Sequence, residues 1–403
     1  MDAIGSIDGE TAAMIYFILG GDSMFEKTKN LCDAFLRLGV PGFDIMVCKD
    51  GETVLRHMGG YSDMENRIPV QGNERYNIYS CSKFITCAAA MQLWEKGMFS
   101  LEDRLSDYMP VFSQMTVKTD EGIKPAKNPI LIKHLFEMTA GFSYDVYSPC
   151  LQAFYEETDF RCPTVESINQ LAKEPLLFEP GERWNYSLCH DVLAALVEVL
   201  SGRKFQDYVK QNIFVPLGMS RSDFLLPKEE QHTIAPQYMF DDERGRAVRH
   251  SENYYRPGSE YASGGAGCVS TVEDYMKFLE AMRKGNIILK KDTVALMARN
   301  RLTEKQAETY IHAPLHGYGL GIRTPKESGH RKDFGWGGVA GAYLAVDTTN
   351  GITLYYSQHL INSPIHPFRY LIYSAVVADI LGKDIFPQEM EIYENLIKRA
   401  RGK

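Results

Sequence analysis

The sequence lacks the signatures of several large classes of protein. Its 403 residues contain no Gly-x-Ser-x-Gly motif, which excludes a hydrolase of the nucleophile-elbow type. Its eight cysteines are never spaced as Cys-x-x-Cys and several lie in apolar runs, so reduced thiols in a cytoplasm explain them better than disulfides or zinc ligands. Lysine and arginine form no long run and the net charge is −8, which argues against nucleic acid or an anionic membrane as the main partner.

Long apolar segments are missing as well. The apolar stretch near the N-terminus, residues 12–20, is shorter than the ~20 residues that span a bilayer. Acidic residues precede it, where an export signal would carry positive charge. Regular hydrophobic patterning begins only near Met24. We therefore interpret residues 1–23 as an N-terminal extension, and we expect a cytoplasmic protein whose partner is a small molecule.

The most informative stretch begins Tyr79-Ser80-Cys81-Ser82-Lys83 and continues through an alanine-rich segment to Gly97. These residue types favour a helix that a serine can open and a glycine can end. On such a helix the first serine and the lysine share a face, with Cβ atoms ~5–6 Å apart, so the amine can take the hydroxyl proton. Unpaired N–H groups at the helix start would also stabilise an oxyanion. We predict Ser80 as a nucleophile and Lys83 as its proton partner.

The same pair also fits a simpler interpretation, a serine cap followed by a solvated lysine. Average composition gives roughly one or two Ser-x-x-Lys matches by chance in a chain of this length. The second match, Ser201 to Lys204, lies where an apolar helix ends at a glycine, and we interpret it as a boundary between helices. For Lys83 to serve as a base, burial or a second positive group would have to favour its neutral form.

Segments with strand character lie at both ends of the chain, and segments with helix character lie between them. The strand-like segments are rich in aromatic and β-branched residues or flank an Asp-Gly turn, and they cover residues 43–48, 53–58, 318–323, 341–347 and 352–357. This order predicts an α/β protein of the α+β type, in which both chain ends contribute to one antiparallel sheet and a helical lobe is inserted between them.

Two further patterns are weak candidates for a metal or a cofactor. His312 and His316 have the spacing of a metal-binding pair on a helix, but Pro314 between them disfavours that helix. Residues 335–340 match the dinucleotide fingerprint Gly-x-Gly-x-x-Ala, but a strand follows where the fingerprint requires a helix. We predict a backbone-exposing turn at a sheet edge there, and we expect neither a metal nor a cofactor.

Three motifs together resemble a known superfamily. They are Ser80-x-x-Lys83, Phe178-x-Pro180-Gly181-x-x-Trp184-x-Tyr186-Ser187 and Trp336-Gly337-Gly338. Their order and spacing are similar to those of the serine β-lactamases and penicillin-binding proteins. The Trp-Gly-Gly triplet looks most like the family VIII carboxylesterases and related acyl transesterases, a branch similar to class C β-lactamases. Residues 132–141 and 264–271 add two supporting blocks, and the likeness runs from about residue 26 to 380.

The resemblance implies a β-lactamase/DD-peptidase-like fold and a set of roles. Residues 24–403 would form a single catalytic domain, with an α/β lobe from about 24–79 and 270–403 and a helical lobe over about 80–269.

In this arrangement Ser80 would be the nucleophile and Lys83 its proton partner. Tyr186 would be the phenolate-like base that returns the proton to the leaving group. The N–H of Val339 would complete an oxyanion site with that of Ser80.

Two departures from the β-lactamase pattern bear on the substrate. Leu188 stands where that branch has the asparagine of Tyr-x-Asn, and Trp336 stands where it has a carboxylate-binding lysine. Gly337 and Gly338 would let the backbone approach an acyl group closely. A literal Tyr-x-Asn at residues 393–395 lies in the charged tail, and we interpret it as coincidence.

Both departures point away from carboxylate-bearing lactams. They favour a serine hydrolase that acts through an acyl-enzyme on small carboxylic esters. The alternatives are an acyltransferase, a β-lactamase or a D-amino-acid peptidase of the same superfamily, and a catalytically idle relative that only binds its ligand.

Replacing Ser80 with Ala should abolish acyl-enzyme formation, because only this serine precedes a lysine by three residues at a predicted helix start. Ser82→Ala and Ser201→Ala are the matched controls and should keep most of the activity. Turnover of a nitrophenyl ester by the three variants measures this. A loss in Ser201→Ala as large as that in Ser80→Ala would contradict the assignment.

Overall fold

The computed structural model describes residues 24–250, 258–326, 329–385 and 389. Its centre is an eight-stranded sheet with the strand order β10-β11-β12-β13-β14-β1-β2-β3, in which all pairings are antiparallel. The strands are β1 (Gly42–Lys49), β2 (Glu52–Asp63), β3 (Ile68–Pro69), β10 (Gly317–Tyr318), β11 (Arg323–Thr324), β12 (Phe334–Gly337), β13 (Tyr343–Asp347) and β14 (Ile352–Gln358). The predicted antiparallel sheet with flanking helices is confirmed.

The two ends of the chain meet in the middle of this sheet. Strand β1 pairs with β14, and Phe43 lies opposite Gln358 while Lys49 lies opposite Ile352. The register places alternate side chains on the same face. Every residue of β14 is buried, since both faces of the sheet are covered.

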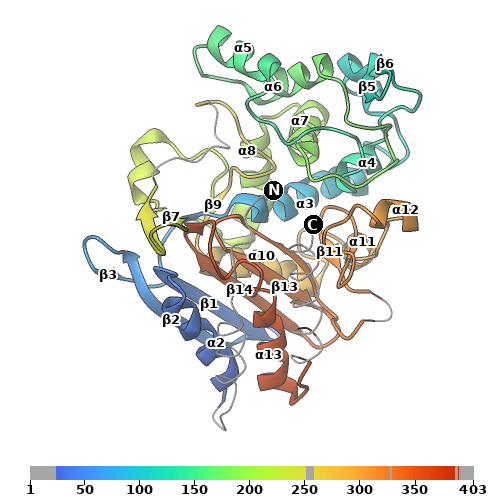
Figure 1. The fold of residues 1–403 in the computed structure, drawn as a ribbon. Coiled ribbons are helices and arrows are strands. Elements are labelled where there is room, and N and C mark those ends of the chain that lie inside the picture. Colours follow the sequence, from blue (N-terminus) through green and yellow to red (C-terminus); the bar gives the residue numbers. More distant parts are fainter. Residues whose placement is uncertain (1–23, 251–257, 327–328, 386–388, 390–403) are drawn as a thin grey trace.

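Helices cover the two faces of the sheet. The covering helices are α2 (Glu26–Arg37), α13 (Leu371–Leu381) and α10 (Val272–Lys284). Helices α2 and α13 lie side by side on one face, where they share an apolar cluster with Leu354 and Tyr356 (Figure 1). On the other face, Tyr355 stacks on Tyr275 of α10 with ring centroids 4.5 Å apart. The alternation along β14 thus fixes which helix packs on which face.

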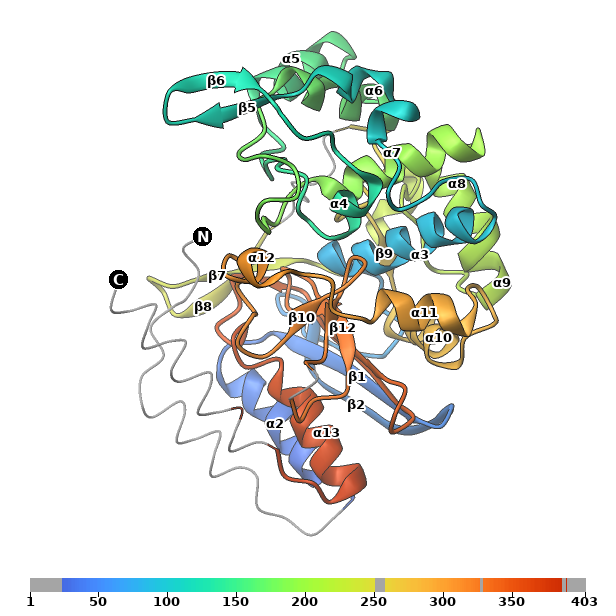
Figure 2. The same cartoon turned by 90° about the vertical axis from the view of Figure 1, so that its right-hand side faces the viewer.

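A helical lobe stands above the sheet (Figure 2). Its helices are α4 (Ile132–Phe136), α5 (Pro149–Glu157), α6 (Thr164–Asn169), α7 (Cys189–Ser201), α8 (Phe205–Val209) and α9 (Val215–Leu217). Short strands also occur in this part of the chain: β4 (Tyr76–Asn77), β5 (Thr116–Thr119), β6 (Gly122–Pro125), β7 (Tyr238–Asp241), β8 (Arg246–Arg249) and β9 (Val269–Ser270). Strand β7 also pairs in parallel with β15 (Leu360–Ile361).

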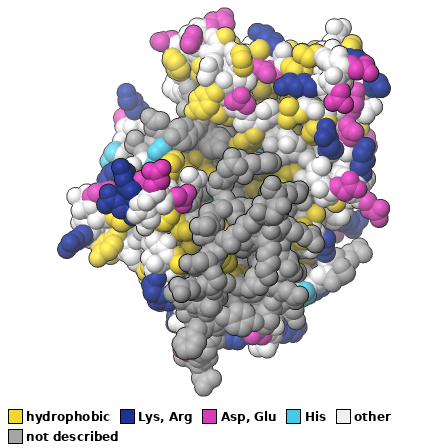
Figure 3. All heavy atoms as spheres, viewed as in Figure 1, with side chains coloured by type: hydrophobic (Ala, Val, Ile, Leu, Met, Phe, Trp, Pro, Cys, Tyr) yellow, Lys and Arg dark blue, Asp and Glu magenta, His cyan; other side chains and the backbone are white. Residues whose placement is uncertain are grey.

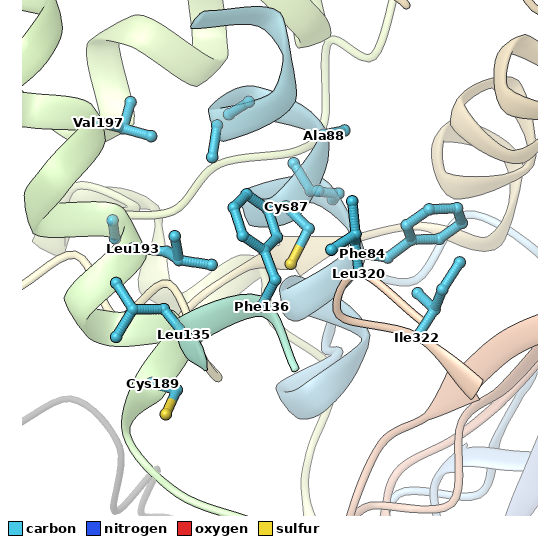
Figure 4. Packing of buried hydrophobic residues seen from close by; sticks show 14 of the residues in the cluster. Phe84, Cys87, Ala88, Leu135, Phe136, Cys189, Leu193, Val197, Leu320 and Ile322 are labelled. Carbon is cyan, nitrogen blue, oxygen red and sulfur yellow. The ribbon is translucent and has the colours of Figure 1, made fainter. Parts of the chain in front are cut away.

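Helix α3 (Ser82–Glu95) lies between the lobe and the sheet. It is buried nearly all round, which explains why its sequence is apolar without a clear polar face. Figure 4 shows Phe84 and Cys87 of α3 packed among side chains of α4, α7 and the 320–322 segment. The helix that follows the predicted nucleophile is therefore the shared core of both lobes.

Three local predictions were wrong in detail. Ser80 does not open α3 as a side-chain cap; it lies in a 3-10 turn, Tyr79–Cys81, that runs directly into the helix. The predicted strand over residues 318–323 is two short strands joined by a turn, and Gly321 at the turn has φ +86. The predicted edge turn at residues 335–340 begins as β12, which lies inside the sheet between β11 and β13.

The surface and the cysteines add two observations. On the face shown in Figure 3, acidic and basic side chains are interspersed over the helical lobe. All eight cysteines lie in the described part of the chain, and none is paired in a disulfide.

No helix in the described ranges combines the length and apolar character that a membrane span requires. The interpreted extension, residues 1–23, and the Tyr-x-Asn of residues 393–395 lie outside the described residues.

A buried charge network holds the strands β11, β12 and β13 together. The Asp333 carboxylate accepts hydrogen bonds from Arg323 at 2.5 Å and from Arg331 at 2.9 Å. Arg331 also donates to Glu389 at 2.8 Å and to the Tyr343 hydroxyl at 2.7 Å. Burial acts to raise the pKa of Asp333, but the two guanidinium groups outweigh it and hold the value at about 2.

Asp333→Ala should lower the free energy of unfolding by about 3–5 kcal/mol, because it leaves a buried guanidinium without its counter-charge. Asp241→Ala is the control, since its pair with Arg244 is largely exposed and should be worth at most about 1 kcal/mol. Urea unfolding of both variants measures the difference. Equal small losses in the two would contradict this interpretation.

The same carboxylate gives the stability a pH dependence. Because the folded pKa of Asp333 lies below the unfolded value of about 3.9, its contribution is complete above that value and is lost as pH falls toward 2. The stability gap between wild type and Asp333→Ala should therefore narrow below about pH 4.

Candidate active site

Ser80 stands where the chain turns sharply between β4 and α3. The residue before it, Tyr79, has φ +46, a left-handed conformation that a bulky residue rarely adopts. The Tyr79 hydroxyl donates to the Gln237 side chain at 2.5 Å, which helps to hold this turn. Ser80 is 8% exposed and lies two residues before the first residue of α3.

Lys83 has no exposed surface and is surrounded by acceptors. Its Nζ donates to the Gly265 carbonyl at 2.7 Å and lies 3.3 Å from both the Ser80 Oγ and the Tyr144 hydroxyl. The same nitrogen lies over the ring of Tyr186, 4.6 Å from its centroid. Carbonyl oxygens and ring faces are environments that suit a cation.

Tyr186 contacts the same serine from the other side. Its hydroxyl oxygen lies 2.5 Å from the Ser80 Oγ, a hydrogen-bond distance. Its ring lies between two others: Tyr144 at 5.0 Å and Trp336, stacked at 5.9 Å between centroids. The structure therefore brings Ser80, Lys83 and Tyr186 together as the motif order predicts, and their catalytic roles stay predictions.

The third motif runs against the turn that carries Ser80. A side chain at Gly338 would stand 2.6 Å from the Ile78 carbonyl oxygen, so only glycine allows this approach. Val339 packs against a small cluster that contains Tyr79 and Ala266. The motif thus lies beside the nucleophile turn, and the Val339 N–H as an oxyanion donor stays a prediction.

Arg369 fixes the turn of the third motif. This buried side chain donates from Nη1 to the Gly338 carbonyl at 2.6 Å and to the Ala342 carbonyl at 3.2 Å. A side chain at Gly337 would meet the Arg369 guanidinium at 2.8 Å. The two glycines therefore make room for the chain of Ile78 on one side and for an arginine on the other.

The two residues that depart from the β-lactamase pattern have different surroundings. Leu188 is 2% exposed in the main core, and its backbone N–H donates to the Ser143 carbonyl. Trp336 is packed by the rings of Tyr186, Tyr318 and His312. Burial, together with two arginines, lowers the pKa of His312 to about 3, so this imidazole is uncharged at neutral pH.

Other titratable groups near Ser80 are kept uncharged. Burial raises the pKa of the neighbouring Cys81 thiol to about 12, so it is no competing nucleophile at neutral pH. Burial and the charge of Lys83 lower the pKa of His190 to about 3. In the described part of the chain, no three His, Cys, Asp or Glu side chains gather as metal ligands.

Several contacts of this site are absent from the sequence prediction. Tyr144 and Gly265 bind Lys83 from positions 61 and 182 residues away. Of the two influences expected near the lysine, burial or a second positive group, the structure shows burial, and it also places the buried carboxylate of Asp191 nearby. The only sequence signal was indirect, because Gly265 belongs to the supporting block 264–271 and Asp191 follows Tyr186 by five residues.

The chain belongs to the β-lactamase family, whose profile matches residues 28–365. It is 29% identical over 368 residues to esterase EstB of Burkholderia gladioli, which covers 84% of this chain and 91% of that protein. Monacolin J acid methylbutanoyltransferase of Aspergillus terreus is 27% identical over 318 residues, 74% of this chain and 76% of that one. The predicted superfamily resemblance is confirmed.

The fold has close counterparts among solved structures. That of EstCE1, described as a hydrolase with promiscuous acyltransferase activity, matches with a TM-score of 0.72 at 22% identity and covers 91% of this chain and 98% of its own. At this identity the likeness shows the fold alone. The β-lactamase/DD-peptidase-like fold is confirmed.

Lys83→Ala and Tyr186→Phe should each lower kcat at least ~10²-fold, the low end for general acid–base catalysis. Because both side chains contact the same hydroxyl, the double variant should be little worse than either single one. Steady-state kinetics of the three variants and wild type measure the coupling. Losses that multiply would show two independent roles and contradict a shared proton path.

Proposed function

We propose that this protein is a serine hydrolase that cleaves small carboxylic esters through an acyl-enzyme on Ser80. The observation that carries the proposal is the contact of one serine hydroxyl with both Lys83 and Tyr186. Family membership and the similarity to an esterase support the same reaction class. An idle binding relative would have no need to keep these three side chains in mutual contact.

The reaction follows from these contacts in two halves. As the Ser80 oxygen bonds to the ester carbonyl carbon, its proton passes to the Tyr186–Lys83 pair. Collapse of the tetrahedral intermediate breaks the bond to the alcohol, which takes that proton and leaves. Water then attacks the acyl-enzyme by the same route, and the acid is released.

In this proposal the oxyanion donors are the N–H groups of Ser80 and Val339. The Ser80 N–H belongs to the nucleophile turn, and Val339 follows the glycine that packs on Ile78 of the same turn. Removing one donor that is aimed at the developing negative charge typically lowers kcat by 10²–10³-fold. Arg369 supports this arrangement by holding the Gly338 carbonyl, directly before Val339, in a fixed position.

The wall beside Tyr186 favours an acyl group without a carboxylate. The indole of Trp336 stacks on Tyr186, and the uncharged imidazole of His312 lies behind it. The nearby Arg369 is buried and already donates to the Gly338 and Ala342 carbonyls, so a carboxylate placed here would lose its hydration at a cost of roughly 1–3 kcal/mol or more. Short apolar acyl chains have no such penalty.

Acyl transfer to a second alcohol is the other candidate, and one feature of the structure favours it. A cavity of about 1200 Å³ is lined by Asn77, Tyr147 and Gln237, which adjoin the nucleophile turn and the Tyr144 loop. Ser80, Lys83 and Tyr186 are not among its lining residues, so it is a neighbouring space rather than the reaction centre. A space of this size suits a bulky alcohol that intercepts the acyl-enzyme.

Nitrophenyl butyrate should be turned over with a kcat/KM roughly ten to more than a hundred times that of nitrocefin, because the lactam carboxylate would lie unpaired beside Trp336. Both substrates release a chromophore, so one spectrophotometric assay compares them. Adding an alcohol acceptor to the butyrate assay separates hydrolysis from transfer, since transfer raises chromophore release without raising acid release.

A lactam rate equal to or above the ester rate would reverse the ranking and make the protein a β-lactamase. The control is Trp336→Lys, which restores a cation at this position and should narrow the difference between the two substrates.

A further inference from the structure

Asp191 is a buried carboxylate close to the reaction centre, and no step described so far uses it. It lies in the first turn of α7, five residues after Tyr186, and is 1% exposed. Its Oδ1 accepts hydrogen bonds from the Ser263 hydroxyl at 2.6 Å and from the Tyr261 hydroxyl at 3.2 Å. The Gly265 N–H donates to the same carboxylate.

These contacts tie Asp191 to Lys83 through a single peptide unit. The carboxylate holds the N–H of Gly265, and the carbonyl of Gly265 accepts the Lys83 amine at 2.7 Å. A Cβ at Gly265 would stand 2.4 Å from Asp191 Oδ2 and 3.4 Å from Lys83 Nζ. The two charged groups are therefore within about 6 Å of each other, the range in which an opposite charge favours the charged form.

The glycine is a necessary part of this arrangement. Any side chain at Gly265 would enter the space between the carboxylate and the amine. Gly264 is restricted in the same way, because a Cβ there would stand 2.5 Å from the His190 carbonyl oxygen. The Gly264 carbonyl accepts a hydrogen bond from the Thr86 hydroxyl at 2.7 Å. Thr86 lies on α3, one turn after Lys83. The glycine pair thus lets the segment lie flat between α3 and α7.

We propose that Asp191 is a positioning residue that keeps Lys83 charged and aimed at Ser80, so that Lys83 acts as a fixed cation while Tyr186 carries the proton. This inference rests on the proposed function. It assigns the base to the tyrosine. A carbonyl oxygen, two ring faces and a nearby carboxylate all favour the ammonium form of the lysine, and an ammonium has no lone pair with which to accept a proton.

The groups that face the pair are few and define the conditions of a test. Lys83 is faced by Tyr144 and Tyr186, and Asp191 by Tyr261. Burial and the charge of Lys83 keep His190 neutral, with a pKa lowered to about 3. Two thiols, Cys87 and Cys189, also lie close, and burial raises the pKa of each. Burial raises the pKa of Asp191, whereas the Ser263 hydroxyl, the charge of Lys83 and the Gly265 N–H act to lower it.

The first test is the pH profile of kcat for Asp191→Asn, which keeps the shape and removes the charge. Loss of the carboxylate makes the Lys83 ammonium easier to deprotonate, so activity should fall off on the basic side at a pH lower by about one unit or more. KM should stay near the wild-type value, because Asp191 does not touch the acyl site.

The matched control is Tyr261→Phe, which removes one hydrogen bond to the same oxygen without changing the charge, and its basic fall-off should stay in place. Coincident profiles of Asp191→Asn and wild type, or higher activity of Asp191→Asn at neutral pH, would overturn the proposal. The second outcome would show that the neutral amine is the base.

A second measurement uses the wild-type protein and therefore does not depend on whether an Asp191 variant folds. The side-chain ¹⁵N resonance of Lys83 in wild type, assigned by its absence in Lys83→Met, reports the charge directly. An ammonium signal at pH 8 supports the proposal, and a neutral amine at pH 7 overturns it. Because this readout does not depend on turnover, it stays valid if no ester is cleaved, and failure of Ser80 to react with a fluorophosphonate would count against the proposed function alone.

Discussion

A lysine amine without exposed surface requires acceptors and a counter-charge, and the surroundings of Ser80 depend on meeting that requirement. Lys83 obtains a carbonyl from Gly265 and ring faces from two tyrosines. These partners lie in three connecting segments that are far apart in the sequence, so the amine joins three parts of the chain. The buried helix α3 is the rigid element that carries it.

The sheet supplies the other half of the site by a different physical means. Trp336 lies on a strand whose neighbours are held by buried ion pairs around Asp333. The turn that follows is held by Arg369, and Gly338 allows it to lie on the turn that carries Ser80. Stability and function are therefore linked here, because interactions that hold β11 to β13 also fix the wall beside the nucleophile.

The sequence was sufficient for the features that depend on local spacing or on motif order. Ser80 and Lys83 are three residues apart, so a helical turn alone brings them together. The strand-like segments at both chain ends, with helical segments between them, predicted the antiparallel sheet. Contacts between distant segments could not be predicted, since Gly265 lies 182 residues from its lysine and nothing in either segment indicates the other. The hairpin around Gly321 was missed because its flanking residues favour strands and only the positive φ of the glycine makes the turn.

The central claim is that Ser80 alone forms the covalent intermediate with help from Lys83 and Tyr186. Labelling with a fluorophosphonate, followed by proteolysis and mass spectrometry, tests it most directly. The mechanism predicts one adduct, on the peptide that carries Ser80, formed more slowly in Tyr186→Phe. An adduct on any other residue, or no adduct in a folded wild-type protein, would contradict it.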